Sequence, residues 1–207
     1  MGEMRTCAQC GTVFEPRREH ARFCSAQCRV TWNREHVTGE LNGDTPLSWS
    51  RVAMEDTAQR LGKAAGVSLA EALALISEAV WWVTLVDATM VRYHPAAYDH
   101  ALARLSPAER RGTEGTFAGL RFVRNWMGYH LDPADFIEPG KDATGDTPVA
   151  TWTWRPVPAP DCSSMPPRSR SWESTRHQHY RRYLVGQQVG ETITRAATFL
   201  TQLAPTA

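Results

Sequence analysis

The sequence predicts a mainly α-helical protein, in which a small cysteine-rich module precedes a helical bundle. Three observations support this fold class. Four of the five cysteines lie within the first 28 residues, two stretches between 68 and 131 carry apolar side chains at helical spacing, and eight of the thirteen prolines fall between 133 and 170. At 207 residues the chain is long enough for one ordinary domain with a small appendage.

The composition is typical of a soluble, folded protein. Hydrophobic residues make up 42% of the chain, charged residues 22%, and the net charge is +1, which argues against a disordered chain. The N-terminus lacks the apolar run of a secretory signal, so we expect a cytoplasmic location. The longest apolar stretch, 79–86, is shorter than the roughly 20 residues of a membrane helix. We therefore expect a core helix there and no membrane contact.

The first predicted unit is the cysteine module, residues 1–38. The spacing Cys7-x2-Cys10-x13-Cys24-x3-Cys28 supplies four thiolates, the ligands that suit tetrahedral Zn²⁺. A helix beginning near Ser25 would place the last two sulfurs on one face, about a turn apart. A site closed by four thiolates predicts a structural zinc ion. Disulfides, which a reducing compartment disfavours, and an iron–sulfur cluster are the alternatives.

The second predicted unit is helical and spans 46–204, after a turn-rich joint. Its strongest helix covers 68–92, where Ser68 and Glu71 form a capping-box pattern. A second helix is expected over 108–129, followed by a proline-rich insertion, 133–170, that no helix can cross. An alternating run at 149–157 could pair as a hairpin strand around Trp152 and Trp154. Helical spacing over 172–203 predicts a single closing helix.

The cysteine module resembles the treble-clef zinc fingers of the FCS kind. The stretch CAQCGTVFEPRREHARFCSAQC matches their pattern at the four cysteines, at Gly11 and at Phe23-Cys24-Ser25, and the resemblance covers residues 7–35. It implies one structural zinc and no catalysis at the finger. Arginines at 17, 18, 22 and 29 with Trp32 could contact phosphates and bases, but a solvated face or a protein-docking surface would look the same.

A second motif, Arg124-Asn125-Trp126-Met127-Gly128-Tyr129-His130, ends the predicted 108–129 helix. It resembles the R-x(4–6)-H motif of the HEPN superfamily, whose members are all-α bundles of four to five helices and include many metal-independent endoribonucleases. The resemblance implies catalysis by Arg124, Asn125 and His130 in a homodimer, because positions six apart lie about 120° apart around one helix. It also implies RNA as substrate and the role of a toxin or defence effector.

The chemistry of such a site follows from RNA itself. The 2′-OH is a built-in nucleophile, so cleavage needs a group that moves a proton near neutral pH and a cation that stabilises phosphoryl charge. His130 and Arg124 are residues of these types, and no catalytic metal is expected. Neither the RNA that is cut nor a partner that restrains the activity can be read from the sequence.

The alternative is a zinc-finger adaptor that binds nucleic acid or protein through the finger, or through an arginine-rich stretch at 168–182, while its bundle only dimerises. In that case Arg124 pairs with Asp87 inside the bundle, and His130 caps a helix end. The two hypotheses differ in one observable. A ribonuclease needs Arg124 and His130 in an open cleft, whereas an adaptor would bury both.

Overall fold

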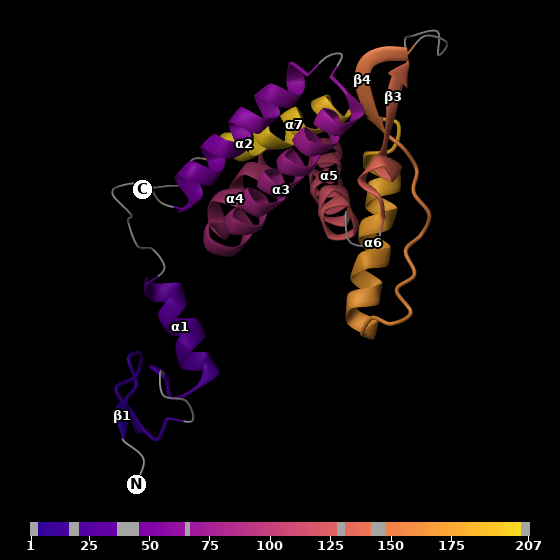
Figure 1. The fold of residues 1–207 in the computed structure, drawn as a ribbon. Coiled ribbons are helices and arrows are strands. Elements are labelled where there is room, and N and C mark those ends of the chain that lie inside the picture. Colours follow the sequence, from indigo (N-terminus) through magenta and orange to yellow (C-terminus); the bar gives the residue numbers. More distant parts are fainter. Residues whose placement is uncertain are drawn as a thin grey trace. The chain divides into compact units, whose positions relative to one another are not determined.

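The chain divides into two compact units, Met1–Pro46 and Leu47–Ala207. The computed structural model describes residues 4–16, 21–36, 46–64, 67–127, 131–141 and 148–203. Seven α-helices lie in these ranges, together with two small antiparallel sheets (Figure 1). The prediction of a mainly helical protein is therefore confirmed. Most of the predicted joint, 37–45, lies outside the described residues.

The N-terminal unit is a two-stranded hairpin followed by a helix. Strand β1 (Arg5–Thr6) pairs with β2 (Val13–Phe14), and helix α1 (Ala26–His36) comes after them. Gly11 turns the hairpin with a φ of 72°, in the left-handed region that favours glycine. Among the described side chains of this unit Cys7 alone is buried. The described residues of this unit therefore form no apolar core, and a unit of this kind commonly gains folding energy from a bound metal ion.

The second unit is a bundle of six helices. In chain order they are α2 (Pro46–Gly62), α3 (Leu69–Tyr93), α4 (Pro95–Ala103), α5 (Pro107–Trp126), α6 (Pro167–Tyr183) and α7 (Val189–Thr201). Helix α3 packs against α4, α5 and α7, and α5 packs most extensively against α6 (Figure 1). The largest fully buried side chains come from all parts of this unit, and include Met54, Ile76, Phe117, Phe122, Trp154, Tyr180 and Ile193.

The predicted capping box at the start of α3 is confirmed, and local signals also start α4 and α5. Ser68 caps α3 by accepting from the backbone N–H of Glu71, whose carboxylate accepts in turn from the Ser68 N–H. Ser106 and Glu109 make the same reciprocal pair at the start of α5. Pro95 is the first residue of α4, a position where its missing N–H costs nothing.

Helix α3 matches the predicted helix 68–92 to within one residue at each end and is strongly apolar. Its 25 residues have a mean hydropathy of 1.6 over an 18-residue window, enough by length and composition to cross a membrane. Nine side chains of α3 are nevertheless buried within the helical unit, and the core helices of soluble proteins commonly have this composition.

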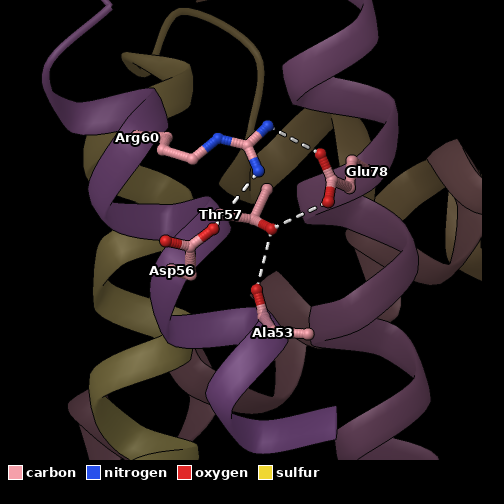
Figure 2. A network of polar contacts seen from close by, with 5 residues as sticks. All are labelled: Ala53, Asp56, Thr57, Arg60 and Glu78. Atoms are coloured by element: carbon pink, nitrogen blue, oxygen red, sulfur yellow. Dashed lines mark hydrogen bonds and ion pairs between the residues drawn. The ribbon is translucent and has the colours of Figure 1, made fainter.

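A polar network joins α2 to α3 (Figure 2). Arg60 donates to Asp56 Oδ2 at 3.2 Å on its own helix and to Glu78 Oε2 at 2.9 Å on α3. The buried hydroxyl of Thr57 lies 2.7 Å from the Ala53 carbonyl oxygen and 3.3 Å from Glu78 Oε1. Glu78 thus contacts both neighbours on α2, and these contacts fix the register of the two helices.

The proline-rich region contains the predicted hairpin. A short 3₁₀ turn (Pro133–Phe136) leads into β3 (Ile137–Lys141), which pairs with β4 (Pro148–Trp154). Trp152 lies opposite Pro139 and Trp154 opposite Ile137. No helix crosses 133–170 in the described part of this region, but α6 begins at Pro167, five residues before the predicted start at 172, because proline is tolerated in the first turn of a helix.

The predicted single closing helix is two helices. Between α6 and α7 the chain turns through Gly186, whose φ of 79° a continuing helix cannot adopt. The N–H of Gly186 donates to the Trp154 carbonyl oxygen at 2.8 Å, and the Trp154 N–H donates to the Gln187 carbonyl oxygen at 3.0 Å. The hairpin therefore binds this turn. Val185 lies in the connection, although the helical spacing over 172–203 had included it in the single closing helix.

Helices α5 and α6 approach closely at two glycines. A Cβ atom on Gly119 would lie 2.7 Å from Leu184 Cδ1 and 3.1 Å from the Tyr180 Cα. A Cβ atom on Gly115 would lie 2.3 Å from the Tyr183 ring. Only residues without a side chain allow this separation, so the glycines determine how near α6 lies to α5.

Candidate functional site

The four cysteines at the N-terminus form one cluster. The Sγ atoms of Cys7, Cys10, Cys24 and Cys28 all lie within 4.8 Å of one another, and none is in a disulfide. Cys24 Sγ is 3.6 Å from Cys10 Sγ and 3.5 Å from Cys28 Sγ. Four sulfurs around a tetrahedral zinc ion at about 2.3 Å would stand roughly 3.8 Å apart. The cluster could therefore hold a metal ion such as zinc.

Local backbone geometry brings the two cysteine pairs together. The turn after β1 is closed by the Cys7 N–H donating to the Thr12 carbonyl oxygen at 2.9 Å, and by the Gly11 N–H donating to the Cys7 carbonyl oxygen at 3.0 Å. The Cys24 N–H donates to Cys7 Sγ at 3.4 Å. Cys24 precedes α1, which begins at Ala26. The expectation of two sulfurs on one helix face therefore holds only for Cys28.

The ionisation of the thiols is mutually constrained. Burial opposes ionisation of Cys7, but N–H groups of Cys10, Cys24 and Gln9 outweigh burial and lower the pKa of its thiol to about 6. The neighbouring sulfurs of Cys28, Cys10 and Cys7 raise the pKa of Cys24 to about 12. Four negative charges at this separation repel one another strongly. A fully ionised cluster therefore requires a bound cation.

The arginine motif lies at the end of α5, which is shorter than predicted. The helix ends at Trp126, and Met127 is already extended with φ −64° and ψ 124°. Arg124 lies in the last turn and is exposed to solvent, whereas the sequence pattern had placed it on the apolar stripe. His130 lies outside the described residues. Its position relative to Arg124 therefore remains a prediction.

The proposed pairing of Arg124 with Asp87 is wrong. Asp87 is completely buried on α3, and its carboxylate accepts from the Arg121 guanidinium and, at 2.7 Å, from the Tyr98 hydroxyl. Burial raises the pKa of Asp87, and the charge of Arg121 and the hydroxyl of Tyr98 oppose that shift. The arginine that enters the bundle is thus the one a turn earlier on α5, and Arg124 remains on the surface.

Arg124 is instead part of a polar network that reaches α6. Its Nη2 lies 3.4 Å from Asn125 Oδ1, and the Asn125 amide donates to Glu173 Oε1 at 2.9 Å. The Trp126 indole N–H donates to the other oxygen, Glu173 Oε2, at 2.9 Å. Arg176 also pairs with Glu173. Glu173 therefore fixes the Asn125 amide so that its carbonyl oxygen faces Arg124.

Sequence reasoning missed the role of Glu173. This carboxylate is buried although it sits in the arginine-rich stretch 168–182, which predicted a solvated or phosphate-binding face. The available signal was Trp126, whose indole N–H needs an acceptor when buried. The acceptor lies 47 residues away along the chain, a separation that helix periodicity does not reveal.

Three hollows of the helical unit have linings that do not include Arg124. An open groove of about 640 Å³ is bordered by α5, α6 and α7 and includes Arg182 and Arg195. A neighbouring hollow of about 500 Å³ is lined by β4 and the start of α7, and also includes Arg195. A small hollow of about 200 Å³ contains Cys162 and His177. Burial raises the pKa of the Cys162 thiol, so this cysteine is a poor nucleophile.

No family model matches the chain, and no curated protein or solved structure matches it either. The protein is therefore described from its own sequence and structure. It is a mainly helical protein with a four-cysteine cluster near the N-terminus that could hold a metal ion, and its helical unit exposes an arginine supported by a buried carboxylate.

Proposed function

We propose that the protein is a metal-independent endoribonuclease of the HEPN type, preceded by a treble-clef finger with one structural zinc ion. The supporting observation is the position of Arg124. This guanidinium is exposed, and within the described residues it has no carboxylate partner, because Asp87 is engaged by Arg121. An adaptor that used Arg124 to close its bundle would bury it.

The finger is assigned zinc because of its donor set. Four sulfur ligands at tetrahedral spacing suit Zn²⁺, and a unit without an apolar core needs the binding energy of the metal to fold. Thiolate ligation of this kind is stable in a reducing compartment, which accords with a cytoplasmic protein. The ion has a structural role, and no step of the reaction passes through it.

In the proposed reaction, the 2′-oxygen of RNA attacks the adjacent phosphorus and the bond from phosphorus to the 5′-oxygen breaks. His130 moves the proton between the 2′-hydroxyl and the departing 5′-oxygen. Arg124 stabilises the charge that builds on the phosphoryl oxygens, because its planar fork can donate two hydrogen bonds at once. Asn125 orients Arg124. The products are a 2′,3′-cyclic phosphate and a 5′-hydroxyl, and cells would need to restrain the activity.

The decisive experiment incubates labelled RNA with the full chain, both with zinc bound and in EDTA. We expect equal cleavage under the two conditions, and cyclic phosphate ends. The His130→Ala variant should lose about 10²–10⁴-fold in rate, and Arg124→Lys should also fail because a point charge does not reproduce the guanidinium fork. Arg92→Ala removes another exposed arginine, at the end of α3, and should cleave normally. Full cleavage by His130→Ala would refute the mechanism.

The alternative function, a binding regulator without catalysis, is favoured by one feature of the finger. The Arg22 guanidinium lies 4.9 Å from the centre of the Trp32 ring, and Phe23 lies 5.6 Å from the same ring. Such a group of arginine and aromatic side chains can contact nucleic acid. If the purified chain binds RNA and leaves it intact, and if Arg22→Ala abolishes that binding, the regulator is correct.

A further inference from the structure

Trp49, Trp81 and Trp172 of the helical unit are exposed. Trp81 and Trp172 each have an arginine beside the ring. Trp81 on α3 is 53% exposed and Trp172 on α6 is 52% exposed. The Arg124 guanidinium carbon lies 5.9 Å from the centre of the Trp81 ring, and that of Arg168 lies 5.0 Å from the Trp172 ring. An exposed aromatic face beside a guanidinium group is an arrangement on which an unpaired base can stack.

A series of contacts runs from Trp81 on α3 across α5, which lies between α3 and α6, to Arg176 on α6 (Figure 1). Trp81 contacts Arg124, Arg124 contacts Asn125, and Asn125 shares the Glu173 carboxylate with Arg176. Trp172 and Arg176 are four residues apart on α6 and therefore lie on one side of that helix. We call this surface the tryptophan strip, and it consists of Trp81, Arg124, Asn125, Glu173, Arg176 and Trp172.

The charge that the strip presents to solvent is positive. Its single carboxylate, Glu173, is buried and already accepts hydrogen bonds from Asn125, Trp126 and Arg176. The arginines are exposed or half-buried, and Arg168 adds a further charge beside Trp172. The surface thus alternates aromatic faces with guanidinium groups, the combination that binds bases and phosphates of an unpaired strand.

We propose that the tryptophan strip binds single-stranded RNA, with bases stacked on Trp81 and Trp172 and the intervening phosphate held by Arg124 and Arg176. The proposal rests on the proposed function in taking RNA as the polymer, and it specifies the unpaired strand as the form that is bound. A duplex keeps its base faces inside the stack and offers none to a tryptophan.

The test is fluorescence anisotropy with the full chain and a labelled 2′-O-methyl oligonucleotide of about 12 residues, within the range of single-strand site sizes. This probe lacks the nucleophile and cannot be cut. We expect Trp81→Ala and Trp172→Ala each to weaken binding about 5- to 150-fold, the range for loss of one stacked base. Trp81→Phe keeps an aromatic face and should retain most of the affinity, whereas Trp81→Leu should not.

Tyr93 provides the matched control. It is 50% exposed on the same helix, twelve residues beyond Trp81, and Arg92 lies 5.3 Å from its ring centre. Tyr93→Ala should bind the probe like the wild type. The proposal is overturned if Trp81→Ala and Trp172→Ala bind normally, if duplex RNA binds as tightly as the single strand, or if light scattering shows that the tryptophan variants only alter self-association.

The same measurements separate this proposal from the proposed function. Wild-type protein that binds the probe through the tryptophans yet leaves RNA intact would refute the ribonuclease and support the strip. If both tryptophan variants cleave RNA at the wild-type rate, the ribonuclease is supported and the strip is refuted.

Discussion

The close packing of α5 on α6 can be tested at Gly119. Alanine there places a Cβ atom 3.1 Å from the Tyr180 Cα and 3.3 Å from its backbone nitrogen, besides 2.7 Å from Leu184 Cδ1. The Leu184 side chain can rotate away, but the backbone of α6 cannot. Overpacking of this kind lowers the free energy of unfolding by about 1–3 kcal/mol. The higher helix propensity of alanine raises it by about 1 kcal/mol.

Gly112 is the control on the same helix. A Cβ atom there meets no atom within 4 Å, so Gly112→Ala keeps only the propensity gain and should raise the free energy of unfolding by about 0.5–1 kcal/mol. The free energies of unfolding of Gly112→Ala and Gly119→Ala should therefore differ by the cost of overpacking, about 1–3 kcal/mol. For a unit of this size, each kcal/mol shifts the melting temperature by about 2–4 °C.

The assay is thermal unfolding followed by circular dichroism, with the wild type, Gly112→Ala and Gly119→Ala under one set of conditions. We expect Gly112→Ala to melt above the wild type, and Gly119→Ala to melt below Gly112→Ala by roughly 2–12 °C. Equal melting temperatures for the two variants would show that α6 can move away from α5 without cost. The packing argument would then be refuted.

Four further predictions concern the finger, the core and assembly. Metal analysis should find close to one zinc per chain, and Cys24→Ser should lose it while the helical circular dichroism persists; iron would contradict the assignment. Burial raises the pKa of Asp87 above its usual 3.8, so the folded state keeps this proton to a higher pH than the unfolded state does. The free energy of unfolding therefore falls as the pH rises from 3.8 through the raised pKa of Asp87. In denaturant unfolding, the free energy of unfolding of Asp87→Asn should not show this fall with pH. Parallel pH dependences for the wild type and Asp87→Asn would contradict the prediction. Thr57→Val removes the hydroxyl that contacts Glu78 and should lower the free energy of unfolding by about 0.5–1.5 kcal/mol; an unchanged denaturation midpoint would contradict this. Light scattering should find a dimer at micromolar concentration, and a monomer would exclude the composite active site.

Local sequence signals predicted the elements whose causes are local. Ser68 was identified as a helix start because a capping box needs only residues three apart. The hairpin around Trp152 was indicated by alternation, which is likewise a short-range pattern. The four cysteines were grouped by spacing alone, and the structure brings their sulfurs within 4.8 Å of one another.

The errors concern features that tertiary contacts decide. Periodicity placed Arg124 on the apolar stripe of its helix, yet Arg121 is the residue that reaches Asp87, since the orientation of α5 is set by α3 and α6 together. The break between α6 and α7 follows from Gly186 and from hydrogen bonds to Trp154. Glu173 has three partners, and two of them, Asn125 and Trp126, lie more than 40 residues away, so the chain neighbours of Glu173 do not indicate them.

The packing of α5 on α6 and the proposed reaction are coupled through Glu173. Gly119 precedes Asn125 by six residues, about 9 Å along the helix, so a Cβ that pushes α6 outward also draws the Glu173 carboxylate from the Asn125 amide. We therefore expect Gly119→Ala to reduce RNA cleavage at temperatures where it is still fully folded, and Gly112→Ala to leave the rate unchanged. If both variants cleave like the wild type while Gly119→Ala is destabilised, then the carboxylate serves the fold alone, and Arg124 needs no support from α6.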